Sequence, residues 1–526
     1  MGYPVRDENG PDSEWTVFQQ LRIVSENSKT RKLSGIRSEH GFQSYEDIRR
    51  RVNGMSRSIP PTKPNNAGQL KCVATLLLGG EFPILWMCAV SLLNLTQVPL
   101  NVRWSVREMI NALEDTRPIA LVYDPVYQNI VDAIRSKYGH PIEVVRTDTV
   151  AYPEQGSQGS IETTPNGSQT PFGVFFTSGT TGRSKGAILT HQSFFVQGAA
   201  KLEHVGYNIN TVYLHLVPMF HVGGASSAVA VLMAGGTHVV DDSHTFSADR
   251  VMHLINKFKV TAFAAVPTML RDIVDKVLNT SAKVTSFDSV STILVGGGAL
   301  DSQLKTQVLS VFPAAAIIVA YGMTETASSI TFTDVTARDH DDSGDVGQPP
   351  SHVQLSIVCG KESRNQDQGA TGEIATKGPH VMQGYVGRPR ESATVLQDGW
   401  FLTGDLGSIS ESGSLILRGR RKDMIKTAGE NVYALEVERK LAEHPDVAEC
   451  TILGLPDARY GEIVVAAVVL RSAGRTGWEE DLRSFLRESL SRYKVPKQIF
   501  SMWSLPKNAN GKVLKDEIRR SLTAKL

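Results

Sequence analysis

Cysteine is scarce in this chain, with four residues among 526: Cys72, Cys88, Cys359 and Cys450. They are widely separated, and no C-x-x-C pair or mixed cysteine–histidine spacing typical of metal ligands occurs. Disulfide-dependent folds are usually short and rich in cysteine, and structural zinc sites need closely spaced ligand pairs. We therefore expect neither a disulfide framework nor a zinc site, and the pattern fits a reducing compartment.

An excess of charge of one sign is also absent. Lysine and arginine number 55, and aspartate and glutamate number 54, which gives a formal net charge of +1. Proteins that bind nucleic acid through its phosphates usually carry a basic patch and a marked positive balance. We therefore expect no nucleic-acid partner.

Long uninterrupted hydrophobic runs are missing as well. The N-terminus lacks the apolar core of a signal peptide. The most apolar stretch, Val73 to Val98, is interrupted by residues that a membrane helix disfavours: Gly79, Gly80, Glu81 and Pro83. A spanning helix needs about 20 consecutive apolar residues. We predict a buried helix and strand in this stretch and no membrane span.

The length and composition indicate more than one globular domain. A chain of 526 residues exceeds what one hydrophobic core supports, and 41% hydrophobic and 21% charged residues are ordinary for a globular protein. Helical and strand-like segments alternate over residues 44–145 and 171–330, which predicts an α/β fold. Short strands and turns after residue 330 indicate a β-rich subdomain, and a smaller α/β segment begins at Arg420.

The most informative stretch is Thr177 to Gly186, which reads Thr-Ser-Gly-Thr-Thr-Gly-Arg-Ser-Lys-Gly after a strand-like apolar run. Its glycines let backbone N–H groups approach an anion, its hydroxyls donate further hydrogen bonds, and Arg183 and Lys185 add positive charge. It is not a Walker A loop, because Ser184 stands where that motif has its second glycine. We predict a loop that wraps polyphosphate; a solvated turn is the alternative that the residues leave open.

Further motifs follow in order along the chain. They are Met219-Phe-His-Val-Gly-Gly, Gly296-Gly-Gly-Ala, Tyr321-Gly-Met-Thr-Glu-Thr, Trp400-Phe-Leu-Thr-Gly-Asp, Gly419-Arg-Arg-Lys-Asp-Met-Ile-Lys and Asn510-Gly-Lys-Val. The first three are placed at strand ends, where glycines let backbone approach a flat ligand. Asp405, which ends the fourth, is suited to accept hydrogen bonds from two ribose hydroxyls.

Together these motifs resemble the adenylate-forming superfamily, the AMP-binding enzymes, and in particular its branch of acyl-CoA synthetases and 4-coumarate–CoA ligases. The resemblance extends from about Ser44 to Leu514. It implies an α/β fold in which a large N-terminal domain, residues 1–419, has α/β subdomains and a β-rich subdomain. A small mobile C-terminal α+β domain, residues 420–526, would carry the catalytic lysine.

The resemblance also implies a reaction. A carboxylic acid and ATP would give an acyl-adenylate and pyrophosphate, and CoA would then take the acyl group as a thioester and release AMP. Mg²⁺ would be the cofactor, with ATP and CoA as co-substrates. An alternative is an enzyme that loads the acyl group onto a separate carrier protein.

The resemblance assigns roles to individual residues. Lys512, Glu325, Thr324 and His221 would be catalytic, and Glu325 would also hold Mg²⁺. ATP and AMP would be bound by Thr177, Ser178, Gly179, Thr180, Thr181, Gly182, Lys185, Gly297, Gly298, Ala299, Tyr321, Gly322, Asp405 and Arg420. The acyl pocket would be lined by His221, Gly223, Val266, Gly296 and Met323. Lys422 would be the hinge, with Gly429 and Glu430 at the CoA tunnel.

Some of these residues have simpler explanations that the sequence leaves open. Glu325 would also suit a helix N-terminus, Lys512 a solvated turn, and His221 a packed core position beside Phe220. The acidic run Asp339 to Asp345 resembles a metal cluster, but it lacks EF-hand spacing and is better explained as a solvated loop. The tunnel loop departs from the family, since Ala434 stands where proline is usual, which makes that loop less rigid.

Other classes of function are disfavoured. A non-catalytic nucleotide-binding protein would be expected to have lost Lys512, Glu325 or Lys185, and all three are present. We expect neither a serine hydrolase with a G-x-S-x-G nucleophile elbow nor a kinase-like transferase with an H-R-D signature. Fourteen residues follow Lys512, so we expect a stand-alone ligase and not a module fused to a carrier domain.

The sequence says less about the acid and the location. Glycines at the acyl pocket contribute almost no volume, which favours a medium- or long-chain fatty acid or an aryl acid over acetate. The final triplet, Ala524-Lys-Leu, resembles a peroxisomal address read by an import receptor. We expect a peroxisomal protein if the source is eukaryotic and a cytoplasmic one otherwise.

Overall fold

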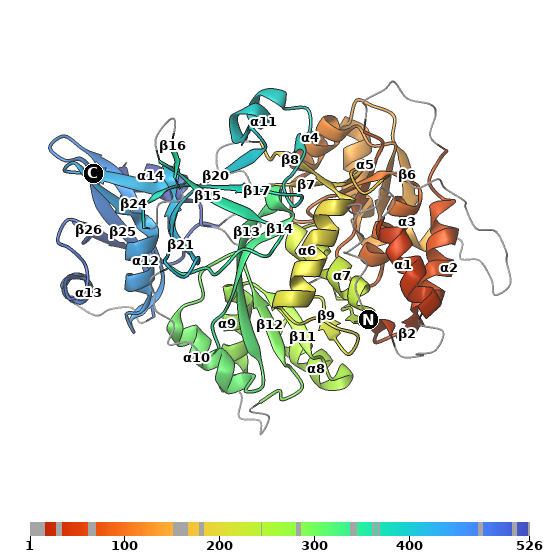
Figure 1. Ribbon diagram of the computed structural model, residues 1–526, viewed down its shortest axis with the longest axis horizontal. Helices are drawn as coiled ribbons and strands as arrows, with labels where there is room; N and C mark the ends of the chain where they lie inside the picture. The colour runs from red at the N-terminus through yellow and green to blue at the C-terminus, as the bar shows by residue number, and fades with distance from the viewer. Residues whose placement is uncertain are drawn as a thin grey trace.

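The fold was analysed in a computed structural model. It describes residues 16–27, 34–61, 70–150, 167–177, 183–243, 245–279, 286–336, 344–359, 363–365, 369–471, 477–507 and 513–523. Within these residues the strands form four sheets, and a large N-terminal part is followed by a small C-terminal one (Figure 1). The α/β fold class expected from the sequence is confirmed.

The first sheet has seven strands and is mostly parallel. Its order is β18 (Gly384–Tyr385), β8 (Gly186–Thr190), β7 (Pro171–Phe176), β4 (Thr96–Pro99), β3 (Cys72–Leu76), β5 (Ala120–Tyr123) and β6 (Glu143–Arg146). From β7 to β6 neighbouring strands are parallel, whereas β8 pairs antiparallel with both β7 and β18. The carboxyl ends of the parallel strands therefore meet at one edge, where α/β proteins usually bind ligands.

The second sheet has eight strands. Its order is β14 (Ser328–Asp334), β13 (Ala316–Met323), β12 (Thr292–Val295), β11 (Ala262–Ala265), β9 (Val212–Leu214), β10 (Thr237–Val239), β1 (Gly35–Ser38) and β2 (Gly41–Ser44). Only the two edge strands, β14 and β2, run antiparallel to their neighbours. The alternation of strands and helices expected over residues 171–330 is thus confirmed.

Two antiparallel sheets complete the chain. One contains β16 (Ser363–Asn365), β15 (Gln354–Cys359), β17 (Gly372–Lys377), β20 (Trp400–Ile409), β19 (Leu396–Gln397) and β21 (Leu415–Arg420), and is the expected β-rich subdomain. The other, in the small C-terminal part, contains β23 (Glu430–Tyr433), β22 (Met424–Thr427), β25 (Gly461–Leu470), β24 (Val447–Asp457) and β26 (Gln498–Ser501), of which β26 alone is added in parallel. Figure 1 shows the β-rich subdomain between the C-terminal elements and the two α/β sheets.

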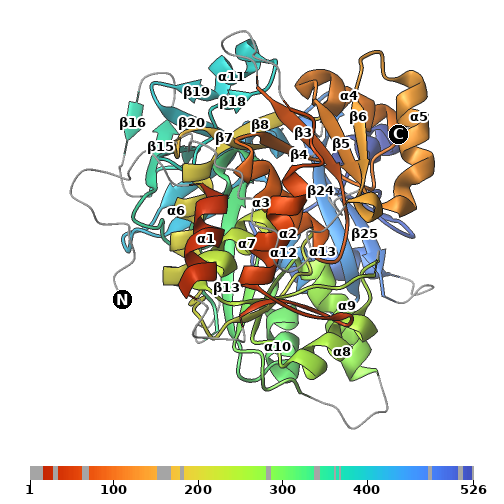
Figure 2. The same cartoon turned by 90° about the vertical axis from the view of Figure 1, so that its right-hand side faces the viewer.

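Helices connect and cover the sheets (Figure 2). The larger part contains α1 (Val17–Asn27), α2 (Tyr45–Ser56), α3 (Phe82–Leu92), α4 (Val106–Thr116), α5 (Gln128–Lys137), α6 (His191–His204), α7 (Val222–Ala234), α8 (Ala248–Phe258), α9 (Pro267–Leu278), α10 (Ser302–Val311) and α11 (Pro389–Val395). The smaller part contains α12 (Ala434–Ala442), α13 (Trp478–Arg487) and α14 (Lys515–Thr523). Short 3₁₀ turns are η2 (Pro125–Tyr127), η3 (Thr147–Thr149), η4 (Thr324–Thr326) and η5 (Arg421–Asp423).

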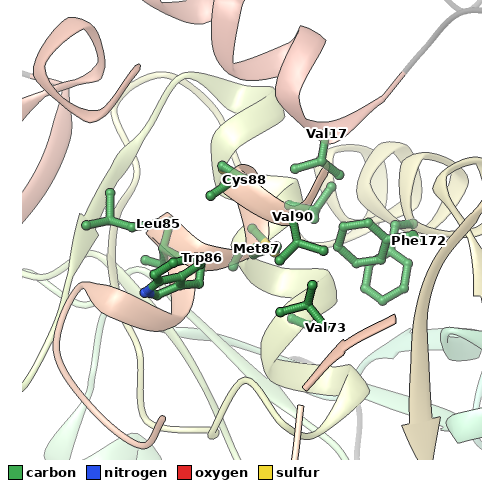
Figure 3. Packing of buried hydrophobic residues seen from close by; sticks show 14 of the residues in the cluster. Val17, Val73, Leu85, Trp86, Met87, Cys88, Val90 and Phe172 are labelled. Carbon is green, nitrogen blue, oxygen red and sulfur yellow. The ribbon is translucent and has the colours of Figure 1, made fainter. Parts of the chain in front are cut away.

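Helix α3 accounts for the most apolar stretch of the sequence. Every residue from Ile84 to Leu92 is buried. Val90 of the helix lies beside Val17 of α1, Val73 of β3 and Phe172 of β7 (Figure 3). A helix that is apolar on all sides belongs in a protein core. The expected buried helix and strand are confirmed, with β3 before α3 and β4 after it. In the described part of the chain, no helix is both long and apolar enough to span a bilayer.

The expected domain boundary, after Gly419, falls at the end of a strand. Strand β21 ends at Arg420 and pairs with β20, so it belongs to the β-rich subdomain. The elements of the small sheet begin with β22 at Met424. The boundary itself remains a prediction from the sequence.

Candidate active site

The predicted nucleotide and acyl residues converge at one edge of the eight-stranded sheet. Ala265, Val295 and Val319 are register neighbours in the parallel strands β11, β12 and β13. The residues that follow them, including Val266 and Gly296, therefore emerge side by side. This edge brings together the predicted acyl-pocket residues of three strands, which are far apart in the sequence.

The glycine run after β12 leaves this edge flat. Gly297 has a φ of +76°, and a Cβ there would lie 3.3 Å from the Val266 side chain. Gly298 is similarly close to Pro267, at 3.4 Å. A side chain at either position would fill the space above the strand ends, so the run suits the approach of a planar group.

A buried carboxylate joins this edge to the β-rich subdomain. The Tyr321 hydroxyl donates a hydrogen bond to Asp405 Oδ2 at 2.8 Å, and Arg420 Nε lies 2.7 Å from Asp405 Oδ1. Asp405 on β20 is 4% exposed and is the register partner of Arg420 on β21. Burial, followed by the Asp405 carboxylate, raises the pKa of Tyr321 well above its ordinary value, so the phenol stays protonated and donates. The structure thus brings together three residues that the sequence assigned to the nucleotide.

Glu325 lies in a second polar cluster. It follows β13 in the turn η4, which begins at Thr324, and its Oε1 accepts a hydrogen bond of 2.8 Å from the Tyr385 hydroxyl. Burial, followed by the Glu325 carboxylate, raises the pKa of Tyr385. The ammonium of Lys185 lies 5.0 Å from the centre of the Tyr385 ring, within cation–π range. One tyrosine therefore contacts both the predicted metal ligand and the predicted phosphate-loop cation.

The phosphate loop joins β7 to β8. The Thr177 N–H donates to the Lys185 carbonyl at 2.8 Å, which closes the ends of the loop. Ser178, Gly179, Thr180, Thr181 and Gly182 lie outside the described residues, so their predicted roles stay predictions. Arg183 was expected to add positive charge to the phosphate loop. Its guanidinium instead donates a hydrogen bond of 2.7 Å to Asp115 on α4.

Gly322 has a structural role at this site. A Cβ on Gly322 would lie 1.7 Å from the Ser328 carbonyl oxygen, where β13 turns back into β14. Only glycine fits so close a backbone approach. Met323, the last residue of β13, accepts a hydrogen bond from the Thr326 hydroxyl at 3.1 Å through its carbonyl.

His221 directly precedes helix α7, which begins at Val222, at the predicted acyl pocket. Burial, with a smaller contribution from the Arg103 guanidinium, lowers the pKa of His221 to about 4, so the imidazole is neutral near pH 7. A Cβ on Gly224 would lie 2.4 Å from the Pro218 carbonyl oxygen, whereas one on Gly223 would meet no heavy atom within 4 Å. Gly224 is therefore required for packing, and Gly223 borders open space.

The predicted hinge and tunnel residues lie in the small C-terminal part or next to it. Lys422 is exposed in η5, directly after β21. Gly429 has a φ of +84° in the exposed hairpin between β22 and β23, and Glu430 begins β23. Lys512, like residues 339–343 of the acidic run and the terminal triplet Ala524-Lys-Leu, lies outside the described residues.

One motif match needs correction. Gly182 to Gly186 read Gly-Arg-Ser-Lys-Gly, which formally fits the G-x-S-x-G pattern of serine hydrolases. In those enzymes the serine stands on a turn from a strand into a helix. Ser184 instead precedes β8 in a strand-to-strand connection. The expectation against a serine hydrolase stands on this topology and not on absence of the pattern.

Sequence reasoning missed three residues at the site: Tyr385, Gln197 and Lys201. Tyr385 contacts Glu325, and the other two lie fully buried on α6 beneath the same turn. A lysine within a helix that runs directly on from an apolar strand was the one available signal for Lys201.

A separate cavity of about 570 Å³ lies at the β1–β2 hairpin and the loop before α3, and none of the predicted site residues lines it.

Comparisons with known proteins agree with this geometry. The chain matches the family described as AMP-binding enzyme over residues 25–386, and the family described as AMP-binding enzyme C-terminal domain over residues 436–512. It is 33% identical over 491 residues to the 2-succinylbenzoate–CoA ligase, chloroplastic/peroxisomal, of Arabidopsis thaliana, covering 83% of this chain and 85% of that protein. It is 32% identical over 493 residues to the indoleacetate–CoA ligase of Aromatoleum aromaticum, covering 92% and 94%.

A solved structure also resembles this fold. It is the o-succinylbenzoate CoA synthetase of Bacillus subtilis in complex with its acyl-adenylate intermediate, which matches with a TM-score of 0.80 and 26% identity over 97% of this chain and 99% of that one.

Proposed function

Because this chain belongs to the family of AMP-binding, adenylate-forming enzymes, we propose that it joins an aryl acid, or a fatty acid of medium or long chain, to coenzyme A. Its enzyme class is that of an AMP-forming acid–CoA ligase. The observation that carries the assignment is the buried Asp405, held by Tyr321 and Arg420 beside a flat glycine edge. A carboxylate with a fixed orientation next to a flat surface suits recognition of ribose hydroxyls and adenine.

In the first step, a carboxylate oxygen of the acid attacks the α-phosphorus of ATP. The bond from that phosphorus to the β-phosphate bridge breaks, and pyrophosphate leaves with the electron pair. The phosphate loop with Lys185 would hold the β- and γ-phosphates, Thr324 would touch the phosphates, and Lys512 would lie between the two anions that react. Fixed positive charge and N–H donors at these points stabilise the charge that develops in the transition state.

Mg²⁺ fits the donors present. Glu325 offers a hard carboxylate oxygen, which suits this ion, and the Tyr385 hydroxyl fixes the orientation of that carboxylate. When bound, Mg²⁺ would neutralise part of the charge on the ATP phosphates. Glu325 would hold it.

In the second step, the CoA thiolate attacks the acyl carbonyl and AMP leaves. We propose that the small C-terminal domain, residues 420–526, turns about Lys422 between the steps, so that Lys512 withdraws and Gly429 borders the pantetheine arm. Gly429 lacks a side chain and has a left-handed backbone, which lets the thiol arm pass close to the main chain. Ala434 begins α12 where proline is usual, and it leaves this hairpin more freedom.

The acid itself is argued from the pocket and the relatives. Gly223 borders open space and the edge formed by Gly296 and Val266 carries little side-chain volume, so the pocket suits an acid larger than acetate. The 2-succinylbenzoate and indoleacetate ligases act on aromatic acids, which favours an aryl acid for this chain. His221 is neutral and would line the pocket without pairing with a substrate carboxylate.

The location is a separate proposal. The terminal Ala524-Lys-Leu would be read by the peroxisomal import receptor if the source is eukaryotic, and a cytoplasmic enzyme is the alternative. The Arabidopsis relative carries a chloroplastic/peroxisomal designation, which supports the first.

The experiment that tests the function is ATP-dependent release of pyrophosphate over a panel of aryl and fatty acids, with and without CoA. Products are identified by mass. AMP together with an acyl-CoA for one class of acid is the expected result. Pyrophosphate release without a CoA thioester would instead indicate transfer to a carrier protein, and silence with every acid would contradict the proposal.

A further inference from the structure

The turn that carries Thr324 and Glu325 has a strained backbone. Directly after η4, Ala327 and Ser328 have φ values of 52° and 126°. Residues with a Cβ adopt such backbone at a cost in free energy, and they keep it only where the surroundings hold them. The turn therefore depends on groups that fix it from outside.

Gln197 is one such group. It lies on α6, is fully buried, and its Nε2 donates to the carbonyl oxygens of Thr326 at 3.0 Å and Ser329 at 2.5 Å. Its Oε1 accepts from the Ser329 N–H at 3.2 Å. One side chain thus bonds to the backbone on both sides of the strained pair.

Lys201 acts one turn further along the same face of α6. Its Nζ donates to the Ser226 hydroxyl of α7 at 2.8 Å and reaches the Ser328 hydroxyl at 3.5 Å. The Ser226 hydroxyl in turn donates to the Gly223 carbonyl at 3.3 Å. Lys201 therefore links the turn to the first residues of α7, at the proposed acyl pocket.

Helix α6 is itself tied to the phosphate loop. It begins at His191, directly after β8, and β8 follows the phosphate loop in the chain. Strand β8 also pairs with β18, which carries Tyr385, the partner of Glu325. The end of the phosphate loop at Lys185, the Glu325 turn and α7 thus all adjoin one strand–helix unit, formed by β8 and α6.

We propose that Gln197 and Lys201 are positioning residues that hold Thr324 and Glu325 in register with the phosphate loop, so that the β- and γ-phosphates of MgATP are bound from both sides at once. This inference rests on the proposed function. Neither residue contacts ATP; each acts through the turn. Their loss should therefore weaken binding of MgATP more than binding of AMP, which lacks the β- and γ-phosphates and binds without the metal ion that Glu325 would hold.

The test compares both nucleotides in matched variants. Affinities for MgATP and for AMP are measured by titration calorimetry in the wild type, Gln197→Met, Lys201→Met and a control, Gln192→Met. Gln192 lies on the same helix but is partly exposed and bonds to Gln169, so the control makes the same change away from the turn. Lys201→Met keeps the side-chain volume and removes a buried amine, so it is expected to fold even if Gln197→Met does not.

We expect Gln197→Met and Lys201→Met to weaken MgATP binding by about tenfold or more, because small displacements of a positioned group are costly. AMP binding should stay within about twofold of the wild type, and the control should match the wild type for both nucleotides. Unchanged MgATP affinity, or an equal loss for both nucleotides, would overturn the inference, since the residues would then serve only the fold. A wild type that binds no MgATP would overturn the proposed function, and this inference with it.

Discussion

The Tyr321 hydroxyl donates a 2.8 Å hydrogen bond to Asp405, a residue 84 positions further along the chain. The bond joins the last strands of the eight-stranded sheet to the β-rich subdomain. Arg420 completes the arrangement from the neighbouring strand. The carboxylate is thereby fixed in direction before any ligand arrives, which lowers the entropic cost of binding one.

Replacing this carboxylate should weaken nucleotide binding. Asp405→Ala is expected to raise the Kd for AMP by about tenfold to a hundredfold, since hydrogen bonds to a charged group contribute about 1.5–3 kcal/mol. Tyr321→Phe, which keeps the carboxylate and removes only its orienting bond, should have a smaller effect. Titration calorimetry with AMP measures both. Equal, small effects would show that Asp405 does not bind the ribose.

Lys512 should separate the two half reactions. Lys512→Ala is expected to abolish formation of the acyl-adenylate, because the variant lacks the charge that offsets two approaching anions. Thioester formation from supplied acyl-adenylate and CoA should remain close to the wild-type rate. Single-turnover assays of each step check this. Equal loss of both steps would contradict the turning of the C-terminal domain.

Two neighbouring glycines should respond differently to the same methyl group. Gly224→Ala places a Cβ 2.4 Å from a backbone oxygen and is expected to cost about 1–3 kcal/mol of stability. Gly223→Ala meets no atom within 4 Å and should leave the melting temperature unchanged. It should instead raise KM for the bulkiest acids, with little change for small ones. A Gly223→Ala enzyme with an unaltered acid preference would remove Gly223 from the acyl pocket.

Acid should destabilise the fold through its buried histidines. Burial lowers the pKa of His191, His215 and His380 to about 3, and of His221 and His352 to about 4. In the unfolded chain each would take up a proton near its ordinary pKa of 6.5, whereas the folded chain does not. The unfolded state then binds more protons, so stability is fully present above pH 6.5 and falls as the pH drops toward 4.

Melting temperatures at pH 7.5, 6.5 and 5.5 test this sign. We expect a small fall from pH 7.5 to 6.5 and a larger one from pH 6.5 to 5.5. The lowest value stays above the range in which most carboxylates titrate. An equal or higher melting temperature at pH 5.5 would contradict the burial of neutral histidines.

Much of the site could be predicted because its motifs follow strand ends. Tyr321 and Gly297 lie where an apolar run gives way to glycine, and parallel strands bring such ends to one edge. Asp405 and Arg420 were assigned to the nucleotide from sequence; the structure pairs them directly across β20 and β21, and their binding role stays a prediction. The local sequence pattern is sufficient to predict these positions, because the parallel strands then bring them together in space.

Tyr385, Gln197 and Lys201 could not be predicted for a related reason. Each contacts the Glu325 turn from an element that is distant in the sequence. These contacts depend on how the elements pack together, which local sequence patterns do not indicate. Arg183 shows the same limit from the other side. Its charge suggested phosphate binding, but in the structure its guanidinium lies 2.7 Å from Asp115 on α4. No pattern in the sequence indicates that contact.

The most direct test of the central claim follows the oxygen of the acid. An aryl acid that the panel assay identifies is labelled with ¹⁸O in its carboxylate and incubated with the enzyme, ATP and CoA. The mass of the AMP formed is then measured by mass spectrometry. If the carboxylate attacks the α-phosphorus, one labelled oxygen remains on AMP and none enters pyrophosphate. Unlabelled AMP, or label in pyrophosphate or phosphate, would contradict the acyl-adenylate mechanism.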